Sequence, residues 1–187
     1  LREYNRYGLQ ILTIHEAIPG HYVQFEYANR IQPEARRLVR AVFGSGPYIE
    51  GWAVYATELM VQQGYMSKDP ELELTWLKQE LRAVANTILD IRMQTMGMTD
   101  DEALKLMTTR TFQETEEATA KLQRAKLASC QLPTYYAGFR AWHQLRDAVA
   151  MRDGDKFRAG EFHGRALSEG ALPMTELARL LGVGTLK

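Results

Sequence analysis

The residue types best suited to chemistry gather in one short segment, residues 13–22. This segment holds His15 and His21, two of the four histidines in the chain, and Glu16 directly follows the first of them. Hydrolytic zinc sites are built from such groups, because neutral imidazoles bind the metal while a carboxylate takes a proton from metal-bound water. The segment therefore predicts a zinc-dependent hydrolase.

The spacing of the two histidines differs from that of a single zinc-binding helix. In the pattern His-Glu-x-x-His the imidazoles share a helical face, whereas His15 and His21 would lie roughly 120° apart around a straight helix. Pro19 and Gly20 lie between them, and a helix break there would swing His21 back toward His15. Spacing alone leaves two possibilities open, a metal site or a Pro-Gly turn with two polar histidines beside it.

Length, charge and cysteine content restrict the class of protein. A chain of 187 residues, 45% of them hydrophobic, can form one sizeable core, and we expect residues 1–187 to be a single domain. Because 23 basic residues balance 23 acidic ones, no bulk charge favours nucleic acid or an anionic membrane. No apolar run approaches the ~20 residues of a membrane span. Cys130, the one cysteine, leaves the compartment open between cytoplasmic and exported.

Apolar residues recur at helical spacing along the chain, and no alternating strand pattern stands out, so we predict an all-α domain. Proline, glycine and capping residues mark the helix boundaries. The expected helices span residues 3–18, 22–31, 34–43, 48–63, 70–96, 100–109, 111–129, 134–151, 155–168 and 175–181. We assign the charges of residues 111–129 to a solvated face without function, and the three tryptophans, Trp52, Trp76 and Trp142, to the core.

A zinc site also needs a third ligand and an open coordination position. Glu50 is the best candidate, because it opens the predicted helix 48–63 in the layout of peptidases whose third ligand is a glutamate on the next major helix. Glu58 follows two turns later on approximately the same face, where it could orient a ligand. Taken alone, the two residues are explained more simply as a glutamate in a favourable first turn and a solvent-exposed glutamate.

Together, the two segments resemble a known family. Residues 15–24 followed by residues 50–55 are similar to the bacterial proteins catalogued as domain of unknown function 885, which are regarded as metallopeptidase-like members of the gluzincin group. The resemblance continues in the segments 135–138 with 145–146 and 162–163 with 170–173. Family members are usually far longer. The resemblance therefore implies that residues 1–187 are the C-terminal catalytic part, against which a helical N-terminal region of the parent protein packs.

The resemblance implies zinc-promoted hydrolysis of a peptide or small amide. His15, His21 and Glu50 would hold one Zn²⁺ per chain, and the ion would lower the pKa of a bound water toward about 7. Glu16 would be the general base that accepts the proton of this water and delivers it to the leaving amine. These four residues form the predicted catalytic and metal-binding set.

Four further residues are assigned roles around this set. Tyr135 is the candidate donor to the tetrahedral oxyanion, and His143 is the second candidate. Arg146 would either bind a substrate carboxylate or form a buried ion pair, and we favour the structural role. His163 is interpreted as a packing or capping residue.

Two other functions stay open. A degenerate, non-catalytic helical binding module is favoured by the six-residue histidine spacing and by Tyr22, which stands where many relatives have a second histidine. A metal-dependent hydrolase of a non-peptide amide or ester would use the same ligands as a peptidase. Metal analysis would distinguish the binding module from an enzyme. The sequence does not distinguish the non-peptide hydrolase from a peptidase.

Overall fold

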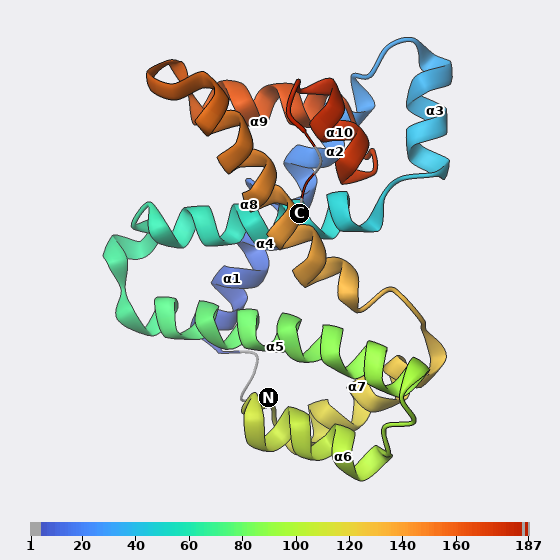
Figure 1. Cartoon of the computed structure of the whole chain (residues 1–187). Coiled ribbons are helices and arrows are strands. Elements are labelled where there is room, and N and C mark those ends of the chain that lie inside the picture. Colours follow the sequence, from blue (N-terminus) through green and yellow to red (C-terminus); the bar gives the residue numbers. More distant parts are fainter. Residues whose placement is uncertain (1–4, 185, 187) are drawn as a thin grey trace.

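The computed structural model describes residues 5–184 and 186, and every regular element within them is helical, which confirms the predicted all-α fold (Figure 1). None of these helices is both long and apolar enough to cross a membrane. The α-helices are α1 (Arg6–Glu16), α2 (His21–Asn29), α3 (Glu34–Val42), α4 (Gly46–Gln62), α5 (Pro70–Thr95), α6 (Asp100–Lys105), α7 (Thr115–Leu127), α8 (Pro133–Asp153), α9 (Ala159–Ser168) and α10 (Met174–Leu180). Short 3₁₀ turns cover Tyr65–Lys68 and Gly154–Lys156.

Most helix boundaries agree with the prediction because local capping groups set them. The Asp69 carboxylate accepts the Glu71 N–H at 2.9 Å and starts α5. Thr99 and Glu102 form the expected capping box at the start of α6. The first helix begins at Arg6, where the Asn5 side chain accepts the N–H of Gly8. Residues 3 and 4 of that predicted helix lie outside the described residues.

Three predicted helices differ by more than one or two end residues or change their helix type. The helix expected from residue 111 begins only at Thr115, because Phe112 has a φ of +55°, which an α-helix cannot contain. The helix expected over residues 155–168 is split, since a 3₁₀ turn ends at Lys156 and α9 begins at Ala159. The helix expected over residues 100–109 continues beyond α6 as a π-helical turn at Leu106–Arg110.

Two hydrophobic clusters share the long helix α5. The larger cluster joins α1, α4, α8, α9 and α10 with the start of α5. It contains the three tryptophans, whose exposed fractions are 3% for Trp52, 5% for Trp76 and 0% for Trp142, so their assignment to the core is confirmed. The smaller cluster packs Leu89 of α5 against α6, the π-helical turn and α7.

Helices α4 and α8 approach each other backbone to backbone at two glycines. A Cβ atom on Gly138 would lie 2.0 Å from the Pro47 carbonyl oxygen, and one on Gly51 would lie 2.3 Å from the Gly138 carbonyl carbon. Only glycine therefore fits at either position without a shift of a helix. The contact sets Glu50, beside Gly51, close to Tyr135, one turn before Gly138.

Candidate metal centre

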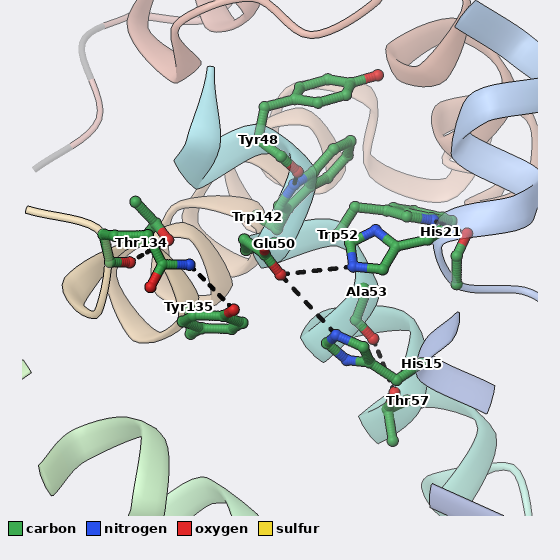
Figure 2. A network of polar contacts seen from close by, with 12 residues as sticks. His15, His21, Tyr48, Glu50, Trp52, Ala53, Thr57, Thr134, Tyr135 and Trp142 are labelled. Carbon is green, nitrogen blue, oxygen red and sulfur yellow. Dashed lines mark hydrogen bonds and ion pairs between the residues drawn. The ribbon is translucent and has the colours of Figure 1, made fainter. Parts of the chain in front are cut away.

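The side chains of His15, His21 and Glu50 converge on one point (Figure 2). The Nε2 atoms of His15 and His21 lie 3.9 Å and 3.4 Å from Glu50 Oε2. One ligand atom from each residue lies within 4.8 Å of the other two, and in the described part of the chain no other such group is as close. Atoms that share one tetrahedral zinc ion are roughly 3.3 Å apart, so small side-chain movements would complete the site.

A helix break brings His21 to this point. Helix α1 ends at Glu16, and α2 begins at His21 itself. Between them the Gly20 N–H donates to the Ile14 carbonyl at 3.0 Å, a wider loop than an α-helical bond closes. The indole N–H of Trp52 in α4 donates to the carbonyl oxygens of Pro19 at 3.0 Å and Gly20 at 3.2 Å. The turn is therefore attached to the helix that carries Glu50.

Burial and neighbouring charge favour the protonation states that a metal requires. Burial, followed by the adjacent His21, lowers the pKa of His15, although Glu16 and Glu50 oppose this effect. Burial by itself would raise the pKa of Glu50. The hydrogen bond from His21, the two imidazoles and the Tyr135 hydroxyl outweigh it and lower that pKa. At neutral pH His15 is thus an uncharged imidazole, able to give an electron pair to a metal, beside the ionised carboxylate of Glu50, as metal binding requires.

The cluster fits a cation better than it fits an empty polar site. The hydrogen bond between His21 and Glu50 is long at 3.4 Å, the His15–Glu50 contact is longer still at 3.9 Å, and the side chains of His21 and Glu50 are only 13% and 22% exposed. Two nitrogen donors and one carboxylate are a typical zinc donor set that leaves a position open.

Glu16 and Tyr135 lie at the edge of a cleft beside the cluster. A cleft of about 340 Å³ is lined by residues of α1, α4, α5, α7 and α8, among them His15, Glu16 and Tyr135. Glu16 is exposed to solvent. Figure 2 shows Tyr135 beside Glu50, and its hydroxyl accepts a hydrogen bond from Gln131 Nε2 at 3.1 Å. The predicted base and the predicted oxyanion donor thus line one cavity together with a predicted ligand.

Glu58 and His143 form a separate pair. His143 Nε2 lies 2.7 Å from Glu58 Oε2, and the His143 ring packs on Phe139 with centroids 4.7 Å apart. Glu58 is about 12 Å along α4 from Glu50, because eight residues of helix rise by that distance. Glu58 thus contacts His143 in the structure, and the expected roles of Glu58 in orienting a ligand and of His143 in stabilising an oxyanion stay predictions.

Arg146 belongs to an aromatic group away from the cleft. Burial, followed by the Arg146 guanidinium, lowers the pKa of His163 to about 4, and His163 Nε2 is hydrogen-bonded to the Tyr55 hydroxyl at 2.9 Å. His163 also packs on Trp52 with ring centroids 5.5 Å apart, as the predicted packing role requires. Arg146 Nε is buried and has no hydrogen-bond partner among the described residues.

The basic wall of the cleft is not predicted from the sequence. Lys121 and Glu117 belong to the helix face that the sequence predicts to be solvated, yet both line the cleft together with Arg82 of α5. The i, i+4 spacing of the two α7 residues was a signal that they share a face. The sequence of α7 does not reveal that α5 and α1 lie across the cleft from this face.

Gly20→Ala should weaken zinc binding by at least about 10–100-fold, the range seen when groups that position a ligand are lost. A Cβ at this position would lie 1.8 Å from the His15 carbonyl oxygen, so the turn must open and carry His21 away from His15. Calorimetric titration with zinc measures the affinity, and the melting temperature of the metal-free protein separates local opening from unfolding. Unchanged affinity would show that the turn does not set the distance between the histidines.

The chain is similar to two solved bacterial structures. A proposed lipoprotein of unknown function from Shewanella oneidensis is 42% identical with a TM-score of 0.90, and the match covers 97% of this chain and 32% of that one. A proposed lipoprotein from Colwellia psychrerythraea is 30% identical with a TM-score of 0.87, covering 94% of this chain and 30% of that one. The chain thus spans roughly a third of the length of these structures.

No curated protein gave a match. Residues 1–181, which include both segments that carry the resemblance, match the family described as bacterial proteins of unknown function, DUF885. The chain therefore belongs to the DUF885 family.

Proposed function

We propose that this chain carries the metal-binding and proton-transfer groups of a zinc-dependent peptidase related to the gluzincins. The observation that supports this function is the convergence of His15, His21 and Glu50 within 4.8 Å, next to a cleft lined by Glu16 and Tyr135. The donor set matches the resemblance to gluzincin-like proteins, in which two histidines and a glutamate from the next major helix hold the metal. One Zn²⁺ per chain is the proposed cofactor.

Each residue of the site has a distinct role in this proposal. His15, His21 and Glu50 would hold the zinc ion, which supplies Lewis-acid activation of a water molecule when bound. Glu16 follows His15 and faces the cleft, so its carboxylate accepts a proton from the attacking water and delivers it to the leaving nitrogen. The Tyr135 hydroxyl donates a hydrogen bond to the oxyanion that develops on the substrate carbonyl.

The size of the cleft favours a short peptide or a small amide as substrate. Its volume of about 340 Å³ is near the lower end of the range for small-ligand sites. The same groups would hydrolyse a non-peptide amide or ester, and trial substrates should include both classes. The packing of a helical N-terminal region of the parent protein against this chain stays a prediction, as do the substrates of the whole protein.

Replacing both histidines, His15→Ala with His21→Ala, should abolish zinc binding. We expect about one zinc per wild-type chain after dialysis and almost none in this variant, because a single carboxylate does not retain the ion. Mass spectrometry of the dissolved metal measures the stoichiometry.

The matched control replaces the other two histidines, His143→Ala with His163→Ala, which the structure places in separate pairs. This control should keep its zinc as long as circular dichroism shows it to be folded. Stoichiometric zinc retained by the variant at residues 15 and 21 would refute the proposed site.

A further inference from the structure

The cleft next to the proposed metal site has a basic wall. Arg82 of α5 and Lys121 and Arg124 of α7 line the same cleft as His15 and Glu16. Arg82 forms an ion pair with Glu117, which ties α5 to α7. Arg124 donates a hydrogen bond to Gln131 Oε1 at 2.9 Å. Glu117 and Glu16 are the carboxylates in the cleft lining, so three cations face two anions, one of which is already paired.

Lys121 is the cation of this wall for which no polar partner is found among the described residues. Its side chain is half-buried, and it forms no ion pair or hydrogen bond with the described residues. Burial, followed by Arg82 and Arg124, lowers the pKa of Lys121 to about 8. An ammonium group placed beside two other cations, in surroundings less polar than water, gains free energy when an anion enters the cleft.

Asn86 adds a neutral polar group that lacks a partner. It lies one turn after Arg82 on α5, is 8% exposed and lines the same cleft. Its Oδ1 atom has no hydrogen-bond partner in the described part of the chain. Because Oδ1 is covered in the free chain, the side-chain amide must rotate before its oxygen can accept an N–H of a ligand and its Nδ2 can donate to a carbonyl or carboxylate oxygen. A peptide presents both kinds of group.

The dimensions of the cleft suit a ligand of a few residues. The lining residues of α1 run from Gly8 to Glu16, which corresponds to about 12 Å of helix. An extended peptide advances roughly 3.3–3.6 Å per residue, so about three residues fit along this wall. The basic wall and the proposed catalytic groups are therefore within reach of one short peptide.

We propose that Lys121, with Arg124 beside it, binds the free carboxylate of a short peptide, while Asn86 binds the peptide backbone. The substrates would then be peptides cleaved close to their free C-terminal end. Recognition rests on the residues of the cleft wall alone. Cleavage rests on the zinc-dependent function proposed above.

The test compares two probes, N-acetyl-alanyl-alanine and its C-terminal amide, which differ in one negative charge. Calorimetric titration of each into the metal-free chain should show at least tenfold tighter binding of the acid. Lys121→Met should remove this preference and Lys121→Arg should retain it, because arginine also binds carboxylates. Lys126→Met is the matched control: Lys126 lies on the same helix, bonded to Asp100 at 2.5 Å, and does not line the cleft.

Binding and cleavage separate this inference from the proposed function. Equal affinity of the wild-type chain for acid and amide would overturn the inference, and this comparison does not depend on any variant being folded. An equal loss of preference in Lys121→Met and Lys126→Met would also overturn it. A preference for the acid without hydrolysis by the zinc-loaded protein would support carboxylate recognition and contradict the proposed peptidase. Hydrolysis without that preference would support the peptidase and contradict carboxylate recognition.

Discussion

Glu16→Gln should leave zinc bound and lower kcat/KM for peptide hydrolysis by roughly 10²–10⁴-fold, the usual contribution of a general base. The amide has nearly the shape of the carboxylate but cannot accept a proton from water at neutral pH. Because Glu16 makes none of the close contacts of the His15–His21–Glu50 cluster, metal content should be unaffected. The loss corresponds to about 3–5 kcal/mol of transition-state stabilisation.

To test this prediction, a pool of peptides is first digested with the zinc-loaded wild-type protein. The kcat/KM of both proteins is then measured on one peptide that the wild type cleaves. Glu26→Gln is the matched control, because Glu26 is paired with Arg30 on the outside of α2 at 3.3 Å and lies apart from the cleft. We expect that control to retain wild-type activity. Near-normal turnover of Glu16→Gln would exclude Glu16 as the base and transfer the role to another group in the cleft.

Gly138→Ala should destabilise the protein by about 3 kcal/mol, the upper end of what overpacking usually costs. The added Cβ would lie 2.0 Å from the Pro47 carbonyl oxygen and 2.8 Å from Gly51 Cα. Backbone atoms cannot turn aside as side chains do, so α4 and α8 must separate at the centre of the larger hydrophobic cluster. A change of this size lowers the melting temperature by roughly 6–12 °C in a domain of this length.

The same substitution at Gly160 is the control for the expected loss. Gly160 lies in the first turn of α9, and a Cβ there meets no atom within 4 Å. Gly160→Ala should therefore stabilise the protein by up to about 1 kcal/mol through helix propensity. Zinc affinity should fall only in Gly138→Ala, because separating the helices moves Tyr135 away from Glu50. A melting temperature for Gly138→Ala equal to that of the wild type would contradict the close helix contact.

The all-α fold and most helix boundaries could be predicted from the sequence because the signals that determine them are local. Asp69 before Pro70 and the pair Thr99 and Glu102 satisfy backbone groups within one turn of themselves. At Phe112, by contrast, no local signal predicts the backbone conformation. Its positive φ interrupts a sequence that is helical in composition, and no proline or glycine marks the position.

The candidate ligands could be identified from residue type and from the Pro-Gly break, but their convergence depends on contacts between distant segments. Helical geometry placed His15 and His21 roughly 120° apart. The observed approach requires the turn at Gly20 and the bonds from Trp52 to the carbonyls of Pro19 and Gly20. Trp52 follows this turn by more than thirty residues, and its position is set by packing of α4 in the core.

Tertiary structure alone decided which polar residues share the site. Glu58 lies on nearly the same face of α4 as Glu50, yet it pairs with His143 because α8 crosses α4 at the glycine contact. Lys121 has the sequence context of a solvated residue, yet α1 and α5 enclose it in the cleft. The sequence by itself determined the helices and the chemical groups they carry, since caps and propensities act within a turn. The partners of each group depend on how helices distant in sequence pack, and that packing follows from the burial of whole faces.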